Sequence, residues 1–313
     1  MKSAVVIILK FIAVTIAMFV CFVVAGSVAG PVAEPQTPEQ AGSAATALLA
    51  VCLLNTLVLT YIILRSSWSG LRLMVTVFFV LYGVTTIMSQ IETVVFVTLP
   101  PGVQSRLFLM GALVAAPFSV LAVLILGKRK ADYWKTDHRN DRLIMSTSEW
   151  AWKLGVIAGT YLILYFTFGY FIAWQNPAVR EYYGGIDHGN FFIQMGSTFR
   201  DMPWLIPFQI FRAMLWTALA LPVVRMMKGS QWEAALAVGL LFSVVMNSQL
   251  LIPNPHMPET VRISHLIETA SSNFIFGLLI GWLLCRRPRA TRRRYYFDRA
   301  ANVRDRLVGR RSR

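Results

Sequence analysis

The densest group of ionisable and amide residues lies near the C-terminal end, in the pattern Arg262-x-x-His265-x-x-Glu268-x-x-x-Ser272-Asn273. Residues three and four apart share one face of an α-helix, so the side chains of Arg262, His265, Glu268 and Ser272 can point into one cavity. A carboxylate beside an imidazole raises its basicity and fixes its orientation. His265 and Glu268 are therefore the candidate acid/base pair, and Arg262 and Asn273 are candidate ligand-binding residues.

Two other interpretations of the same pair are open. His265 and Glu268 could be two ligands of a divalent metal ion, completed by His256, His188 or Glu92. They could also belong to a network that only neutralises buried charge, in which Arg212 pairs with Glu268 or Glu92. The sequence contains no HExxH metalloprotease motif, GxSxG nucleophile elbow or Walker glycine loop. We assign no metal site and identify no cofactor.

The composition places these residues in a membrane protein. Of the 313 residues, 56% are hydrophobic and only 14% are charged, a balance that a soluble domain could not bury while keeping a wettable surface. The three cysteines, Cys21, Cys52 and Cys285, lie inside apolar runs without CxxC spacing, which predicts neither disulfides nor a zinc ribbon. The net charge of +15 is spread over short segments between apolar runs, so we expect no nucleic-acid partner.

Eight apolar runs are long enough to cross a bilayer, because a hydrocarbon core about 30 Å thick requires roughly 20 residues of helix. The sequence therefore predicts an all-α, polytopic transmembrane domain over residues 1–285, followed by a basic cytoplasmic tail over residues 286–313. Proline and glycine clusters separate the runs and predict the loops. The first run could instead be a cleaved signal peptide. The expected spans are 4–28, 45–64, 72–97, 105–126, 151–174, 204–224, 232–252 and 260–285.

The basic residues predict the orientation of these spans. With both termini in the cytoplasm, twenty-four of the 30 lysines and arginines fall on the inner side and four on the outer side, namely Arg106, Arg180, Arg200 and Arg262. This excess follows the positive-inside rule, so we predict an N-in, C-in, multi-pass protein of a cell (inner) membrane. The twelve arginines of the tail would then lie on anionic lipid headgroups.

Counting along each helix from its inner arginine places several polar residues at one level. At about 1.5 Å per residue, Glu268 lies about one turn inside the outer boundary and Arg212 about 12 Å below it. Gln90, Glu92 and Asn247 also fall in the outer third. Because an ionisable side chain in lipid requires a partner or a purpose, we expect spans three, six, seven and eight to enclose an outward-facing pocket. Arg212 would be its anion clamp, with Asn247, Gln90 and Glu92 orienting the ligand.

The segment between the fifth and sixth spans, residues 175–203, is rich in charged and aromatic residues. Gly184-Gly185 provides a hinge, and Phe191, Phe192, Met195 and Phe199 are spaced to form a short interfacial helix. The segment could close over the pocket as a lid, or it could only anchor the protein at the membrane surface.

Two short segments of similar sequence suggest a parallel 4 + 4 repeat. Met88-Ser89-Gln90 near the end of the third span resembles Met246-Asn247-Ser248-Gln249 near the end of the seventh. A proline-bearing turn follows each of them. Some transporters are built from parallel repeats of this kind.

Three classes of function fit these residues. The main prediction is an outward-facing pocket of His, Glu, Arg and Asn side chains that binds or processes a polar or anionic ligand, which can be lipid-linked. The alternatives are a secondary transporter of a small anionic solute and a non-catalytic binding or scaffold subunit. A transporter needs polar groups along its whole path, and the inner halves of the spans offer few. The main prediction requires only a one-sided pocket.

Overall fold

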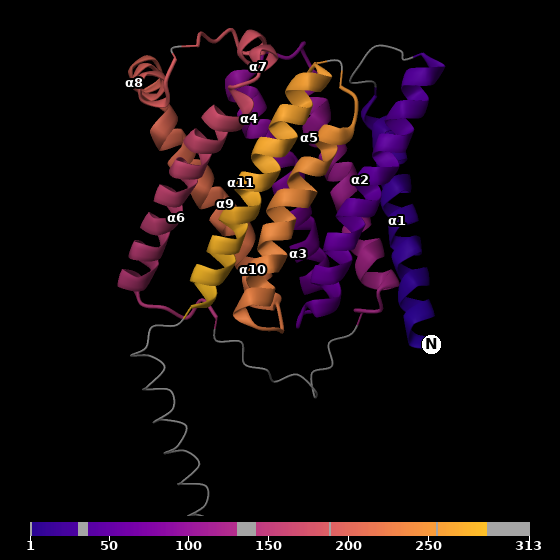
Figure 1. Ribbon diagram of the computed structural model, residues 1–313. Coiled ribbons are helices and arrows are strands. Elements are labelled where there is room, and N and C mark those ends of the chain that lie inside the picture. The colour runs from indigo at the N-terminus through magenta and orange to yellow at the C-terminus, as the bar shows by residue number, and fades with distance from the viewer. Residues whose placement is uncertain (1, 31–36, 130–141, 188, 255, 287–313) are drawn as a thin grey trace, which may run out of the picture.

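The computed structural model describes residues 2–30, 37–129, 142–187, 189–254 and 256–286. These residues form helices joined by short loops, and eight helices are long and apolar enough to cross a membrane. The eight helices lie side by side in one bundle (Figure 1). The chain is therefore an all-helical, integral, multi-pass membrane protein, and the expected number of spans agrees with the structure. The basic tail from residue 287 onward lies outside the described residues.

Three of the eight spans change their helical type along their length. The third runs from α3 (Gly70–Tyr82) through the π-helix η1 (Gly83–Ile87) into α4 (Met88–Phe96). The fifth is α6 (Thr147–Phe168) with the π-helix η2 (Gly169–Ala173), and the seventh is α10 (Gln231–Leu240) with the π-helix η3 (Leu241–Val245) and the 3-10 helix η4 (Ser248–Leu251). The other spans are α1 (Lys2–Ala29), α2 (Pro38–Arg65), α5 (Val103–Ile125), α9 (Leu205–Met226) and α11 (Glu259–Cys285). Two short helices, α7 (Pro177–Tyr182) and α8 (Phe191–Asp201), connect α6 with α9.

Local capping explains where several helices begin. The α2 helix begins at Pro38, earlier than the expected start at residue 45. Thr37 caps it: its side chain accepts a hydrogen bond from the Gln40 backbone, and the Gln40 side chain accepts one from the Thr37 backbone. This capping box and the proline in the first turn stabilise a helix start in a polar sequence. Asn190 caps α8 in a similar way.

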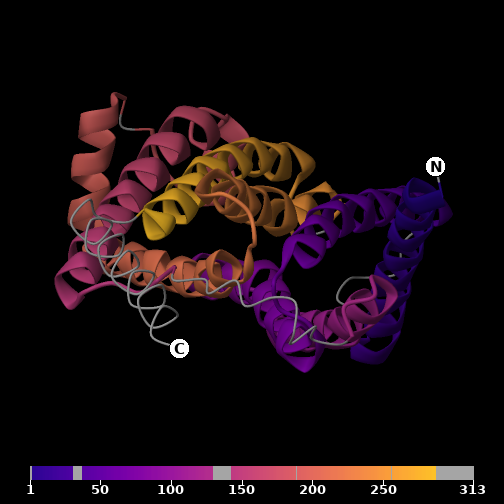
Figure 2. The same cartoon turned by 90° about the horizontal axis from the view of Figure 1, so that it is seen from below.

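The spans form two groups of four that lie beside one another. From below, α1, α2, α3 and α5 lie on one side of the bundle and α6, α9, α10 and α11 on the other (Figure 2). The first residues of α1 and the last residues of α11 lie at the same end of the bundle, which we call the N-terminal face (Figure 1). The helices α7 and α8 lie at the other end, which we call the opposite face (Figure 1).

Small residues bring α10 and α11 close together. A Cβ atom at Gly281 would lie 2.5 Å from the Ala235 Cα atom, and one at Gly277 would lie 2.7 Å from the Gly239 Cα atom. Neither distance leaves room for a side chain. The glycines therefore let the two backbones touch, which is the packing that small residues four apart give in membranes. This contact holds α11, and with it His265 and Glu268, against the seventh span.

Candidate functional site

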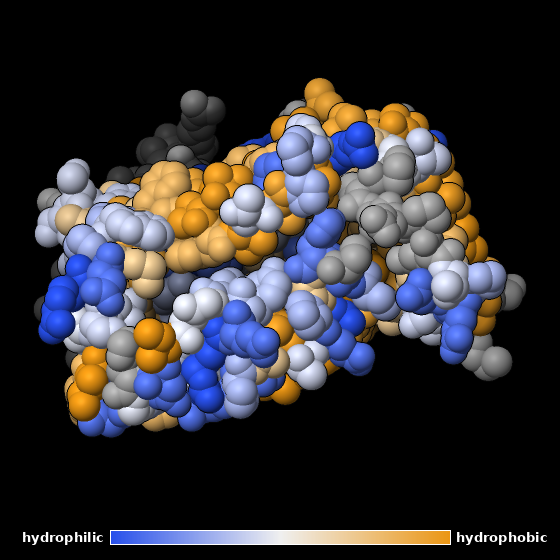
Figure 3. All heavy atoms as spheres, turned by 90° about the horizontal axis from the view of Figure 1, so that it is seen from above, coloured by the Kyte–Doolittle hydropathy of each residue, from blue (hydrophilic) through white to orange (hydrophobic). Residues whose placement is uncertain are grey.

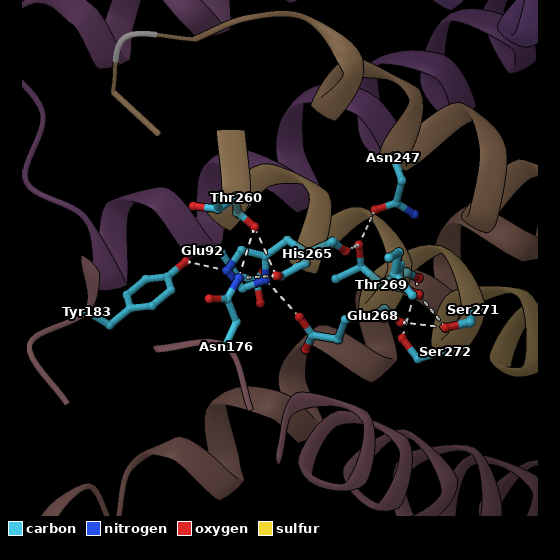
Figure 4. A network of polar contacts seen from close by, with 12 residues as sticks. Glu92, Asn176, Tyr183, Asn247, Thr260, His265, Glu268, Thr269, Ser271 and Ser272 are labelled. Carbon is cyan, nitrogen blue, oxygen red and sulfur yellow. Dashed lines mark hydrogen bonds and ion pairs between the residues drawn. The ribbon is translucent and has the colours of Figure 1, made fainter. Parts of the chain in front are cut away.

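The His265–Glu268 pair forms as its spacing predicts. Both residues lie in the first turns of α11, and Nδ1 of His265 is 2.7 Å from Oε2 of Glu268. The two side chains are mostly buried, at 19% and 11% exposure. Figure 4 shows them pointing toward one another. With Nδ1 bonded to a carboxylate, Nε2 of a neutral imidazole is left as the acceptor.

That second nitrogen faces a tyrosine of the segment between α7 and α8. The Tyr183 hydroxyl lies 3.1 Å from Nε2 of His265 (Figure 4). Desolvation raises the pKa of Tyr183, and the nearby Glu92 carboxylate raises it further. The hydroxyl therefore keeps its proton at neutral pH and is the donor to Nε2 when the imidazole is neutral. Glu268, His265 and Tyr183 form a continuous chain of hydrogen bonds.

The backbone beside Tyr183 is held by glycine packing. Gly184 adopts a φ of +65°, in the left-handed region that favours glycine. A Cβ atom at Gly185 would lie only 2.1 Å from the Trp174 ring, so that this residue packs directly on the indole. The carbonyl of Trp174 also accepts a hydrogen bond from Arg180 at 2.6 Å. These contacts fix the loop that places Tyr183 over His265.

A second charged pair joins two other spans. Arg212 of α9 donates a hydrogen bond through Nη1 to Glu92 of α4, and the same nitrogen donates to Oε1 of Gln209 at 2.9 Å. The Arg212 side chain is only 3% exposed, whereas that of Glu92 is 32% exposed. The guanidinium carbon also lies 5.8 Å from the centre of the Tyr161 ring and 6.0 Å from that of Phe208. Aromatic faces and one carboxylate therefore surround this buried cation.

The two pairs belong to one electrostatic cluster. Glu92 lies close enough to His265 for a direct charge interaction. Tyr161 of α6 interacts with the charges of Arg212, Glu92 and Glu268 together. The third, fifth, sixth and eighth spans thus bring their ionisable groups to one place. With His265 protonated, the cluster holds two positive and two negative groups. With His265 neutral, it carries one net negative charge.

Asn247 connects this cluster to the seventh span. Its side-chain oxygen accepts a hydrogen bond of 2.6 Å from Thr269, the residue next to Glu268 (Figure 4). Its amide nitrogen donates to the backbone carbonyls of Phe242 and Ser243 in η3. Both carbonyls belong to the π-helix, so the Asn247 side chain holds the end of η3. Asn247 is therefore a fixed bridge between η3 and α11.

Three other candidate residues lie outside the central contacts. Gln90 accepts a hydrogen bond of 2.8 Å from Gln104 of α5. Arg262 donates to the carbonyls of Leu250 and Ile252 at 2.8 and 3.0 Å and so holds the connection before α11. Asn273 is buried further along α11, toward the N-terminal face.

Three residues of the cluster were not among the candidates from sequence, namely Tyr161, Tyr183 and Gln209. Gln209 lies three residues before Arg212 on α9, so that helical spacing would have indicated it. Tyr183 belongs to a segment without regular spacing, and no local pattern predicts its contact with His265. Of the possible metal ligands, His188 lies outside the described residues. In the part of the chain that the structure describes, no three His, Cys, Asp or Glu side chains are grouped to hold a metal ion.

The opposite face carries a furrow above this part of the bundle. Figure 3 shows this furrow with hydrophobic residues along one edge and polar residues along the other. Phe96 of α4 and Trp204 and Phe208 around the start of α9 form an aromatic group, with ring centres about 6 Å apart. The arrangement can transfer a proton through His265 and can bind an amphipathic molecule. Comparison with protein families, curated proteins and solved structures finds no match for this chain.

Proposed function

We propose that this protein binds a polar or anionic ligand, expected to be lipid-linked, at the opposite face, and that His265 and Glu268 act on it as an acid/base pair. The observation that carries this proposal is the convergence of Glu92, Arg212, His265 and Glu268 from three spans into one buried cluster. Burying three of these four ionisable groups, Arg212, His265 and Glu268, in a membrane protein is costly. A cluster that only stabilised the fold would not need an imidazole whose second nitrogen faces a tyrosine hydroxyl outside the spans.

The proposed chemistry is a proton transfer at Nε2 of His265. Glu268 accepts the Nδ1 hydrogen and so keeps the lone pair on Nε2. A ligand hydroxyl or water that takes the place of the Tyr183 hydroxyl would give its proton to Nε2. The resulting imidazolium would be stabilised by Glu268 and by the nearby Glu92. His265 would return the proton to the leaving group or to water, which makes it both base and acid.

The amphipathic furrow supports a lipid-linked ligand. Trp204 is 44% exposed, and with Phe96 and Phe208 it forms an apolar wall beside the buried cation Arg212. An acyl or prenyl chain can pack against such a wall while its polar group reaches Glu92 and Arg212. The furrow in Figure 3 has the same two-sided character.

We also propose that the N-terminal face is cytoplasmic, in a cell (inner) membrane, with an N-in and C-in topology. Lys128, Arg142 and Lys228 belong to connections at that face, and Arg225 lies in the last turn of α9 there. The positive-inside rule favours such an excess in the cytoplasm. The proposed site would then face the outside. The arginine tail would bind anionic lipid headgroups of the inner leaflet.

A secondary transporter is the second candidate function, because a parallel 4 + 4 repeat is favoured by the packing. In each half, the first span packs on the second and fourth, and the third packs on the fourth. The third span of each half contains a π-helix, η1 or η3, and these two pack on each other. Ser66 and Met227, after the second span of each half, form an antiparallel bridge. Parallel halves of this kind occur in transporters.

Lipid analysis of cells tests the main proposal. Cells that lack the protein should accumulate an unprocessed lipid-linked molecule, and wild-type protein should reverse this. Glu268→Gln should accumulate in the membrane normally without reversing it. Glu259→Gln, an exposed change at the start of the same helix, is the matched control and should behave as wild type.

Two results would contradict the proposal. Normal lipid processing by Glu268→Gln would show that this carboxylate takes no part in the reaction. Unchanged lipids with lost uptake of a small anion, restored by the wild-type protein, would favour the transporter instead.

A further inference from the structure

Two hydrogen-bond donors in the cluster are buried without an acceptor among the described residues. They are Nε2 of Gln209 and Nε of Arg212, one turn apart on α9. Gln209 is fully buried, and Arg212 is 3% exposed. An unsatisfied donor at such a depth destabilises the fold by about 1–3 kcal/mol, and by more when the group is charged. Two adjacent donors of this kind indicate that an acceptor belongs between them.

The orientation of the Gln209 amide follows from chemistry. Its oxygen accepts a hydrogen bond from Nη1 of Arg212 at 2.9 Å. Exchanging the amide oxygen and nitrogen would place an N–H group against the guanidinium N–H group, and both are donors only. The Gln209 nitrogen must therefore point away from Nη1. Glu92 and Gln209 both engage Nη1 of Arg212, which leaves the Nε edge for another acceptor.

We propose that Gln209 and Arg212 form a subsite for one oxygen of a phosphodiester or carboxylate group. This inference rests on the proposed function, since it names the part of the ligand that the cluster holds. Glu92 already neutralises most of the Arg212 charge, so the subsite selects its ligand by two directed N–H bonds and favours a singly charged group. An Nε edge is one of the two faces through which arginine binds such groups.

The position of the subsite defines how the ligand reaches it. Phe208, beside Arg212, joins the aromatic wall of Phe96 and Trp204. Glu92, at 32% exposure, is the part of the ion pair that water reaches. A ligand that enters from the opposite face would pass Glu92 with its polar end and keep its apolar chain on the aromatic wall. The same oxyanion could come from a lipid headgroup or from a free solute.

Thermal unfolding of the purified full-length protein in detergent tests the subsite. The probes are dihexanoylphosphatidylglycerol, glycerophosphoglycerol, which is the same phosphodiester without acyl chains, and dihexanoylglycerol, which lacks the phosphate. We expect the phospholipid to raise the melting temperature in a saturable way and dihexanoylglycerol to leave it unchanged. A comparable rise with glycerophosphoglycerol would identify a free anion as the source, and a rise with the phospholipid alone would identify a lipid headgroup.

Two variants and one control complete the test. Gln209→Met and Arg212→Lys should each weaken phospholipid binding about tenfold, as expected for a lost hydrogen bond to a charged group. Arg212→Lys keeps a cation opposite Glu92 and decides the case if Gln209→Met fails to fold. Gln249→Met, which removes an amide bonded to the Thr85 carbonyl, should bind as wild type.

The inference is overturned if neither phosphate-bearing probe raises the melting temperature. It is also overturned if either folded variant binds the phospholipid as tightly as wild type. This readout is independent of turnover. If the phospholipid binds and Glu268→Gln still processes lipids in cells, the acid/base proposal fails while the subsite stands. If Glu268→Gln is inactive but neither phosphate probe binds, the proposed function stands and the subsite is wrong.

Discussion

The Glu92–Arg212 pair should contribute measurably to stability, and its two ends should contribute unequally. Glu92→Gln keeps the shape of the side chain but removes the charge that neutralises Arg212, which is 3% exposed. Breaking a fully buried pair costs about 3–5 kcal/mol, whereas an exposed pair contributes about 0–1 kcal/mol. Because Glu92 is 32% exposed, water can partly replace it, and we expect a loss of about 2–3 kcal/mol.

Removing Arg212 instead of Glu92 should lower the free energy of unfolding by less. Arg212→Met removes the buried cation and leaves Glu92, which water can solvate, so we expect a loss of about 1 kcal/mol. The double variant leaves no buried charge at this position and should be more stable than Glu92→Gln alone. The coupling energy of the cycle should therefore exceed about 1 kcal/mol.

Reversible unfolding in mixed micelles, followed by circular dichroism, measures these energies. Glu259→Gln, at an exposed position of α11, controls for the removal of a carboxylate elsewhere and should change stability by less than about 0.5 kcal/mol. If the coupling energy were below about 0.5 kcal/mol, the two side chains would not act as a pair. The electrostatic description of the site would then be wrong.

Three further changes have defined expectations. Gly281→Ala would place a methyl group 2.5 Å from the Ala235 backbone, so it should force α10 and α11 apart and lower the melting temperature by several degrees. Gly185→Ala would collide with Trp174 and move Tyr183 away from His265; ultraviolet difference titration should show a lower Tyr183 pKa. Burial, and secondarily Lys228, lowers the pKa of Lys128 from 10.5 to about 8. Between about pH 8 and 10.5 the unfolded chain therefore binds more protons than the folded protein. The free energy of unfolding should rise with pH over this range in wild type, and it should rise less in Lys128→Met.

Hydropathy predicted the number of spans because lipid leaves few choices for an apolar run of this length. It placed the start of the second span too late, at residue 45, because it counts apolar residues only. The helix begins at Pro38, where Thr37 and Gln40 cap it outside the apolar run. The π-helices η1, η2 and η3 were also not predicted. They depend on how neighbouring spans pack, and no local residue pattern specifies them.

The spacing of residues along the sequence predicts some contacts of the candidate site but not others. The contact between His265 and Glu268 follows from three-residue spacing on one helix. The pair of Arg212 with Glu92 joins residues 120 positions apart. Depth counting at about 1.5 Å per residue placed Glu92 in the outer third of its span and Arg212 about 12 Å below the outer boundary. The choice of Glu92 over Glu268 as the partner of Arg212 required the packing of α4 against α9. The Tyr183 contact required the packing of Gly185 on Trp174.

The position of Tyr183 bears on how the proposed site would work. Its hydroxyl occupies Nε2 of His265, the atom that would accept a proton, so the base is covered while the loop stays in place. The loop is held by one glycine packed on Trp174 and by the Arg180 bond to the Trp174 carbonyl. A ligand that displaced Tyr183 would expose Nε2 and fill the space above the cluster in one event. The same movement would keep water from the base until a ligand was present, and the loop would couple binding to proton transfer.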